Sequence, residues 1–232
     1  RLRLLALVHH PLADEGGLTP AQQRHVEALE RQALSAMRGV ITTSRFSARR
    51  IAQMGLAAAH IEVVEPGVEA RALAAADHSP PRLLCVASLT PRKGHALLVE
   101  ALAMVADLDW QCDCIGSLRR DAQHAARVHA AITAHGLAAR MRLQGELDDA
   151  ALRAAYTDAD LFVLPSHYEG YGMVVTEAVA AGLPVLCTTG GALRDTLPPE
   201  AGIAVPAGDV AALAAALRNL LSHPEARLAL RD

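Results

Sequence analysis

The sequence contains very little lysine and few aromatic residues. Lys93 is the only lysine among 232 residues, and Phe, Trp and Tyr together make up 3% of the chain. Single-stranded nucleic acids bind on aromatic stacking platforms within positively charged grooves, so this scarcity argues against that class of protein. The formal net charge of -3 also lacks the basic surplus that is typical of nucleic-acid-binding domains. We therefore expect no nucleic-acid partner.

Long apolar runs and paired cysteines are missing as well. Although 52% of the residues are hydrophobic, no uninterrupted run reaches the roughly 18 apolar residues of a membrane-spanning helix. The cysteines contain no C-x-x-C pair and fall in predicted strands, which favours buried, reduced thiols over disulfides or a zinc site. The four cysteines are Cys85, Cys112, Cys114 and Cys187. We expect a cytoplasmic protein without a metal site.

Strand-like and helix-like segments alternate in residues 1–67. A buried strand is predicted from Leu2 to Val8, and the chain starts there without a signal peptide or an initiator methionine, so we expect a fragment of a longer protein. Thr19, Pro20 and Gln22 form a capping pattern that predicts the start of a helix. That helix is predicted to end near Met37. The other elements predicted here are a strand at 39–43, a helix from Ser44 to about Met54, and a strand at 61–64.

Residues 68–81 carry no strand pattern and end in a pair of prolines, so we interpret them as a linker or an irregular helix before a second domain at 82–232. In that domain, continuous apolar runs alternate with amphipathic helices, which predicts parallel strands covered on both faces. Its predicted strands lie at 83–87, 111–115, 141–143, 161–164, 184–187 and 202–205. The expected fold is α/β, with a doubly wound parallel sheet in 82–232 and the latter part of a similar domain in 1–67.

The stretch 165–184 is the most informative part of the chain. It follows the predicted strand at 161–164 and leads through a glycine-rich turn into an apolar helix that begins near Gly172. Backbone N–H groups at a helix N-terminus lack intrahelical partners and bind anions. In a doubly wound sheet, ligands lie at the carboxyl ends of the strands, so a phosphate-bearing ligand is expected here. The candidate ligand loops are 88–94, 116–117, 145–146, 165–172 and 188–191.

Several motifs in these loops occur together and in a characteristic order. Glu169 and Glu177 form an E-x7-E pattern within Pro165-Ser-x-x-Glu-Gly-x-Gly-x-x-x-x-Glu-Ala. The accompanying motifs are Pro91-Arg-Lys-Gly94, Tyr156-x-x-Ala159-Asp160, Gly190-Gly191, Gly202 and Pro206-x-Gly-Asp209. Residues 82–232 therefore resemble the donor-nucleotide domain of GT-B glycosyltransferases, specifically the large retaining family four.

The resemblance implies a nucleotide-diphosphate sugar as donor substrate, no cofactor and no metal. Lys93 and Arg92 would offset phosphate charge, Glu177 would accept hydrogen bonds from the ribose hydroxyls, and Glu169 would face the donor sugar. The leaving phosphate would assist the acceptor hydroxyl on the same face of the sugar. The residues expected to act in catalysis are Glu169, Lys93 and His9. Those expected to bind the donor are Ser88, Arg92, Lys93, Gly116, Glu169, Gly170, Gly172, Met173, Val174 and Glu177.

The match to the family has two departures. Members often carry an arginine five residues before the lysine, and this chain has Ser88 there. Residues 1–67 resemble only the second half of the family's acceptor domain, with His9 and His10 where an active-site histidine often follows a strand. The acceptor therefore stays unidentified, and peripheral membrane association of the full-length protein is left open.

Other interpretations remain beside this one. Lys93 also fits a solvated turn, and either His9 or His10 could face the cleft, with His9 favoured. His167 and Tyr168 are placed with even weight inside or outside the donor pocket. The helix histidines His124, His129 and His135 are expected on a solvated face. Alternative functions are a non-catalytic nucleotide-sugar-binding fragment or subunit and a nucleotide-sugar epimerase. A dinucleotide-binding domain is disfavoured, since no G-x-G-x-x-G follows the first strand of either half.

Overall fold

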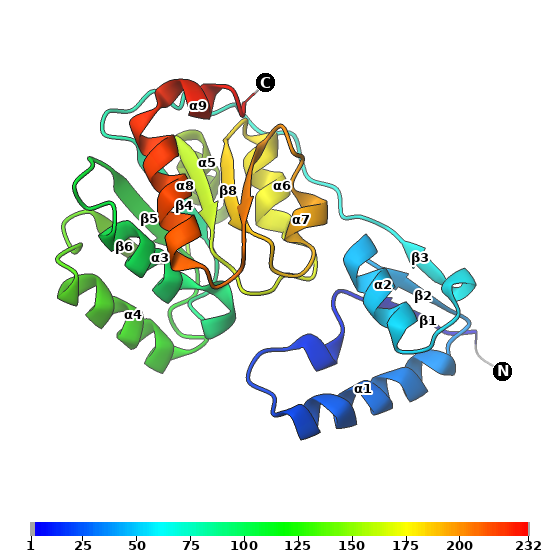
Figure 1. Cartoon of the computed structure of the whole chain (residues 1–232). Helices are drawn as coiled ribbons and strands as arrows, with labels where there is room; N and C mark the ends of the chain where they lie inside the picture. Colours follow the sequence, from blue (N-terminus) through cyan, green and yellow to red (C-terminus); the bar gives the residue numbers. More distant parts are fainter. Residues whose placement is uncertain (1–2, 232) are drawn as a thin grey trace.

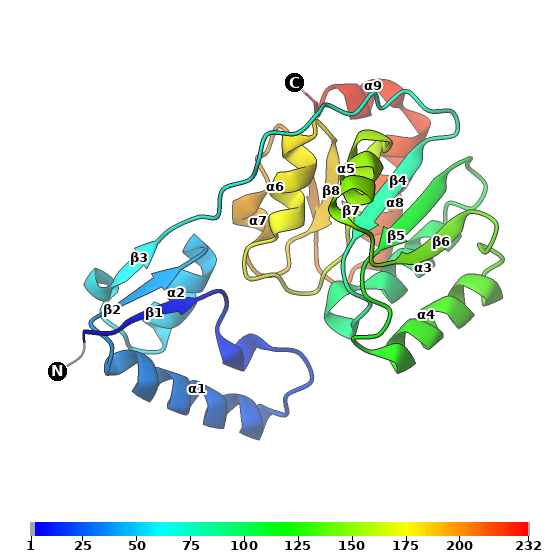
Figure 2. The ribbon, with the colours of Figure 1, turned by 180° about the vertical axis from the view of Figure 1, so that it is seen from behind.

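The computed structural model describes residues 3–231, which form two separate parallel sheets (Figures 1 and 2). The predicted start of the first strand at Leu2 and the outer limits of the predicted domains, residues 1 and 232, lie outside the described residues. The three-stranded sheet has the order β1 (Leu5–Val8), β2 (Gly39–Thr42) and β3 (Ile61–Val63). The predicted α/β fold with parallel sheets is confirmed.

The larger sheet has six strands in the order β6-β5-β4-β7-β8-β9, and all of its pairings are parallel. Its strands are β4 (Arg82–Val86), β5 (Gln111–Ile115), β6 (Met141–Gly145), β7 (Leu161–Leu164), β8 (Val185–Thr188) and β9 (Gly202–Val205). The strand order reverses between β4 and β7. Because ligands of doubly wound sheets bind at such a reversal, outside the carboxyl ends of the strands, the loops after β4 and β7 are the first places to look.

Helices cover both faces of the larger sheet (Figures 1 and 2). The helices of the chain are α1 (Pro20–Ser35), α2 (Arg45–Gln53), α3 (His95–Ala103), α4 (Ala122–Ala134), α5 (Asp149–Thr157), α6 (Met173–Ala180), α7 (Leu193–Thr196), α8 (Val210–Ser222) and α9 (Pro224–Leu228). Short 3-10 turns are η1 (Leu12–Asp14), η2 (Ala58–His60) and η3 (Pro91–Lys93). No helix within residues 3–231 is long and apolar enough to cross a membrane.

The alternation of side chains along each strand decides which helices it packs against. Leu83 and Cys85 of β4 belong to one buried cluster with α3, α4 and α8, whereas Leu84 belongs to a second cluster with α5, α6 and α7. All four residues of β7 are buried, as expected for a central strand covered on both sides. The three-stranded sheet has a much smaller core, built around Leu34, Val40 and Ile51.

Helix starts follow the predicted capping chemistry. Thr19 and Gln22 form a reciprocal capping box at α1, and the Ser44 side chain accepts a hydrogen bond from the Ser47 amide at α2. Some boundaries differ, because α1 ends at Ser35 rather than near Met37, and the short helices α7 and α9 were not predicted. Both have five residues or fewer, which is too short for a hydrophobic period to show.

The connection between the sheets, residues 64–81, contains neither helix nor strand. It runs along the outside of the larger sheet past α6 and α9 before entering β4 (Figure 1). Among the contacts that fasten it, the Ala74 amide donates to the Ala181 carbonyl at 2.8 Å, the His78 amide donates to Asp160 at 3.0 Å, and Arg231 donates to the Ala75 carbonyl at 2.9 Å. The connection is therefore an ordered, irregular linker.

Candidate functional site

The loops that follow β4 and β7 are pressed against each other at the strand-order reversal. Gly94 has a φ of 71°, and a Cβ atom there would lie 2.0 Å from the Pro165 carbonyl oxygen. Only glycine fits that combination of left-handed backbone and close approach. The His167 amide also donates to the Arg92 carbonyl at 2.8 Å. Lys93, immediately before Gly94, is thereby fixed beside the loop that carries Glu169.

The loop from β7 to α6 is shaped by glycines and by Glu169. Gly172 has a φ of 96° and is the N-cap of α6, whereas a Cβ on Gly170 would lie 2.4 Å from the His9 carbonyl oxygen. Gly170 therefore lets the larger domain approach the end of β1. The Glu169 carbonyl accepts the Ala192 amide at 2.9 Å, which ties the loop to the segment after β8. The first amides of α6, at Met173 and Val174, point out of the helix N-terminus, where an anion would be stabilised.

An ion pair joins the two loops. Lys93 Nζ lies 2.6 Å from Glu169 Oε1, and the Ser166 hydroxyl donates to the same oxygen at 2.7 Å. Arg92 Nη1 lies 3.6 Å from Glu169 Oε2 and donates to the Tyr168 carbonyl at 2.8 Å. The Glu169 side chain is 7% exposed and that of Lys93 is 18% exposed. A nearly buried carboxylate is thus compensated by two cations and a hydroxyl.

Two adjoining pockets open at this ion pair. One, the strand-end pocket, has a volume of about 380 Å³ and is lined by Ser88, Gly116, Glu146 and their neighbours. The other, the interdomain pocket, has a volume of about 400 Å³ and lies between the two sheets. It is lined by His9, His10, Glu169, Gly170, Gly172 and Met173, among others. Arg92, Lys93 and Val174 line both pockets. The structure thus brings together all the predicted site residues except Glu177.

Glu177 lines a third pocket, of about 570 Å³, formed by the linker, α5 and α6. We name it the linker pocket. The Glu177 carboxylate has two side-chain contacts there. The Tyr156 hydroxyl donates to Glu177 Oε2 at 2.8 Å, and Arg71 Nη2 lies 3.5 Å from the same oxygen. Met173 lines both the linker pocket and the interdomain pocket, one helical turn from Glu177. Glu177 therefore lies next to the paired pockets and not within their walls.

Two histidines of the smaller domain line the interdomain pocket, and two acids of the same domain contact Tyr168 and Arg92 of the larger one. His10 Nε2 lies 2.7 Å from Glu15 Oε2, and the hydrogen bond with His10 lowers the pKa of the Glu15 carboxyl. The Tyr168 hydroxyl donates to Asp14 at 3.1 Å, and burial raises the pKa of that hydroxyl. Tyr168 thus acts as a contact between the domains, and His9 and His10 both line the pocket.

The prediction for the helix histidines is wrong for one of them. His124 is buried, and burial lowers the pKa of its imidazole, while His129 and His135 are exposed as expected. His124 lies four residues before Val128, which is itself four residues before Ile132, so it shares their buried stripe. That spacing was the available signal. By contrast, no pattern in the sequence indicates Arg71, and Tyr156 and Ser166 stand out only as parts of motifs.

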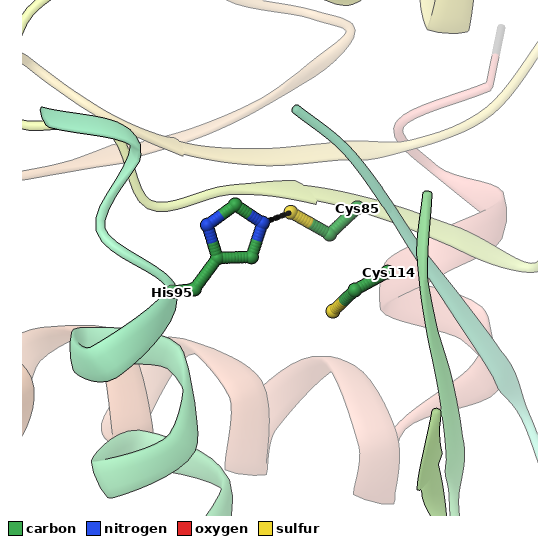
Figure 3. A group of neighbouring side chains, drawn as sticks. All are labelled: Cys85, His95 and Cys114. Carbon is green, nitrogen blue, oxygen red and sulfur yellow. Dashed lines mark hydrogen bonds between the residues drawn. The ribbon is translucent and has the colours of Figure 1, made fainter. Parts of the chain in front are cut away.

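A cluster of buried side chains lies between β4, β5 and the start of α3. Figure 3 shows Cys85, His95 and Cys114 converging from β4, α3 and β5, and their donor atoms lie within 4.8 Å of one another. Structural zinc takes four ligands, and in the described chain no fourth acid, cysteine or histidine joins the group. The hydrogen bond with Cys114, followed by burial, raises the pKa of Cys85 well above its ordinary value. The cluster fits neutral core thiols better than a metal site.

Taken together, the structure places a doubly wound sheet, the Lys93–Glu169 ion pair with Arg92 beside it, and a helix N-terminus at the strand-order reversal, an arrangement whose chemistry suits an anionic group. Residues 69–232 match the family described as Glycosyl transferases group 1. The chain belongs to that family, as the sequence motifs predicted.

Individual relatives agree with this assignment. Glycogen synthase of Mycobacterium tuberculosis is 30% identical over 232 aligned residues, covering 91% of this chain and 52% of that protein. The chain therefore spans about half the length of this curated relative. A sucrose-phosphate synthase from Thermosynechococcus elongatus superimposes with a TM-score of 0.86 and 25% identity, covering 99% of this chain and 61% of that one. Anabaena HepE, solved in complex with UDP and glucose, gives a TM-score of 0.83 at 20% identity, covering 98% and 64%. These similarities confirm the predicted GT-B-like fold.

Proposed function

We propose that this chain carries the donor site of a retaining glycosyltransferase that uses a nucleotide-diphosphate sugar. The observation that carries the proposal is the shared wall of the two pockets. Arg92, Lys93 and the first turn of α6 at Val174 lie where the strand-end pocket meets the interdomain pocket. A diphosphate at this junction would reach two cations and the N-terminal amides of a helix.

The pockets suggest how the rest of such a ligand would lie. The nucleoside would occupy the strand-end pocket beside Ser88 and Gly116, and the sugar would occupy the interdomain pocket next to Glu169. Glu177 would accept hydrogen bonds from the ribose hydroxyls. The similarly folded Anabaena HepE, which was solved with UDP and glucose bound, supports a nucleotide of this kind.

The proposed transfer follows from these positions. The bond between the anomeric carbon and the diphosphate oxygen breaks, and the acceptor oxygen forms a new bond to that carbon on the same face. The acceptor proton passes to the leaving diphosphate, whose charge Lys93, Arg92 and the α6 amides stabilise. His9 would face the acceptor side, since it lines the interdomain pocket from the smaller domain. With these groups carrying the phosphate charge, we propose that no divalent metal is needed and that transfer persists in EDTA.

The acceptor classes to test are a sugar, a lipid-linked acceptor and a small molecule. Peripheral membrane association is proposed for the full-length protein. We propose a cytoplasmic location because all four cysteines are free thiols.

Calorimetric titration with UDP, GDP and ADP tests the donor site. At least one should bind, and Lys93→Ala should weaken binding at least tenfold, because a charged phosphate contact is worth roughly 1.5–3 kcal/mol. Arg119→Ala is the control, since Arg119 is exposed and lines none of the three pockets described above. Failure of all three nucleotides to bind, or equal binding by the Lys93 variant, would contradict the proposal.

Two alternatives are separated by assays of the full-length protein with a panel of sugar donors. A non-catalytic binding protein would bind nucleotide but form no product with any acceptor. A nucleotide-sugar epimerase would convert donor with no acceptor present. Formation of a glycoside with retained anomeric configuration, in EDTA, is the result expected here.

A further inference from the structure

Only one of the two carboxylate oxygens of Glu177 contacts another side chain within residues 3–231. Its Oε2 oxygen accepts the Tyr156 hydroxyl at 2.8 Å and lies 3.5 Å from Arg71 Nη2. Within residues 3–231, no side-chain hydrogen bond or ion pair involves its Oε1 oxygen. The Glu177 side chain is 21% exposed. One carboxylate oxygen is therefore fixed by protein groups, and the other is available to a ligand.

The Arg71 guanidinium has an unusual environment. Its Cζ lies 4.7 Å from the centroid of the Tyr156 ring, and its side chain is 17% exposed. Its Nε and Nη1 atoms are buried and have no hydrogen-bond partner among the described residues. Burying N–H groups without acceptors is unfavourable, so the Glu177 carboxylate and the Tyr156 ring face are the interactions that retain Arg71 in this position.

Tyr156 is the rigid part of this arrangement. It is fully buried and stacks on Phe162 of β7, with ring centroids 5.8 Å apart. Burial is the main reason that its pKa is raised, so the hydroxyl stays protonated and remains a donor to Glu177. A fixed donor of this kind sets the rotation of the carboxylate.

Arg71 belongs to the linker, whereas Tyr156 and Glu177 belong to α5 and α6. The linker is fastened near this point by the Ala74 amide, which donates to the Ala181 carbonyl just beyond α6. Two other segments, the linker and α5, thus converge on a single oxygen of Glu177. A surface ion pair would not need a buried tyrosine and a linker arginine with unpaired N–H groups.

We propose that Arg71 and Tyr156 are positioning residues that hold Glu177 Oε2 and leave Oε1 free to accept the ribose hydroxyls of the donor. This inference rests on the proposed function, because it assumes that Glu177 contacts the ribose. Neither residue would touch the ligand. Their loss should weaken recognition of the ribose and spare recognition of the phosphates.

Titrations of this chain with a ribose and a 2′-deoxyribose ligand test the inference. For whichever of UDP, GDP and ADP binds, the wild-type chain should prefer the ribose form over the 2′-deoxy form by roughly tenfold or more, the usual effect of a hydrogen bond to a charged group. Arg71→Ala and Tyr156→Phe should each reduce that preference to about threefold or less, and Arg71→Lys should restore part of it. Affinity for inorganic pyrophosphate should stay unchanged in all of them.

Arg153→Ala is the matched control. Arg153 lines the same linker pocket but pairs with Glu69 at 3.8 Å, so its removal should leave the ribose preference intact. Thermal unfolding followed by circular dichroism establishes that each variant is folded. Glu177→Gln should lose the preference without further loss when combined with Arg71→Ala, as expected for two residues that act through one group.

The outcomes separate this inference from the proposed function. Retention of the full ribose preference by both variants, equal binding of both ligand forms by the wild type, or a parallel loss of pyrophosphate affinity would each overturn the positioning role while leaving the donor site in place. Absence of nucleotide binding in the wild-type chain, or a nucleotide affinity that is the same in the Lys93→Ala variant, would contradict the proposed function itself.

Discussion

Replacing Lys93 by methionine should destabilise the protein as well as weaken ligand binding. Methionine keeps most of the aliphatic length but removes the ammonium that lies 2.6 Å from Glu169 Oε1. Removing one partner of a buried ion pair typically costs about 3–5 kcal/mol, because an uncompensated charge remains. Here Ser166 still donates to Glu169, and Arg92 remains 3.6 Å away. We therefore expect a loss of about 2–3 kcal/mol, below that range.

A second substitution separates stability from function. Glu169→Gln removes the charge that Lys93→Met leaves unpaired, so the double variant should recover most of the lost stability. It should not recover nucleotide binding, which needs the ammonium itself. For a chain of this length, about 2–3 kcal/mol corresponds to a decrease in Tm of roughly 4–12 °C for Lys93→Met. The double variant should unfold within a few degrees of the wild type.

The assay is a double-mutant cycle in thermal or urea unfolding, combined with calorimetric titration of UDP, GDP and ADP. A coupling free energy below about 0.5 kcal/mol between the two substitutions would mean that the pair does not stabilise the fold, since distant, independent sites add within that limit. Recovery of nucleotide affinity in the double variant would also refute the reasoning, because Lys93 would then matter only as the partner of Glu169.

Two further predictions concern groups away from the pockets. Burial raises the pKa of Glu30, so the stability that its protonated form contributes is present below the ordinary pKa of 4.5 and is lost as the pH rises through the raised value. Glu30→Gln should accordingly raise Tm near pH 7 but not near pH 4, and a larger gain at the lower pH would contradict this. The four cysteines are buried, and burial raises the pKa of Cys187 to about 12, so a thiol reagent should modify none of them rapidly in the folded chain and all four in denaturant. Rapid labelling of the native protein would show that a thiol is accessible.

The sequence predicted elements and loops well because those signals are local. Apolar runs, capping residues such as Thr19, and glycines at loop ends depend on neighbouring residues, and they indicated the strands and their ligand loops. The approach of Gly94 to the Pro165 carbonyl was not predictable in this way, because it depends on β4 and β7 being adjacent in the sheet. For the same reason, the sequence suggests separate roles for Lys93 and Glu169, although their side chains form an ion pair.

Arg71 shows the limit most clearly. It lies in a segment without helical or strand period, so neither spacing nor propensity marks it, and its partners are supplied by α5 and α6. His124 is the opposite case, since its spacing from Val128 and Ile132 indicates a buried face of α4. Grouping it with the other helix histidines, which are exposed, led to the wrong prediction. The position of Arg71 depends on packing between distant segments, whereas the burial of His124 follows from a hydrophobic period within one helix.

The ion pair also constrains how a phosphate ligand would bind. The Lys93 ammonium has three N–H donors, of which Glu169 takes one, so donors remain for an anion at the pocket junction. The Arg92 guanidinium is already engaged by the Tyr168 carbonyl and lies 3.6 Å from carboxylate oxygens of both Glu169 and Glu15. An entering diphosphate would therefore meet Lys93 as its more available cation, and Arg92 would bind it only by giving up protein contacts. Since Ser88 supplies no charge in this loop, the single lysine of the chain is the group on which diphosphate affinity should depend most strongly.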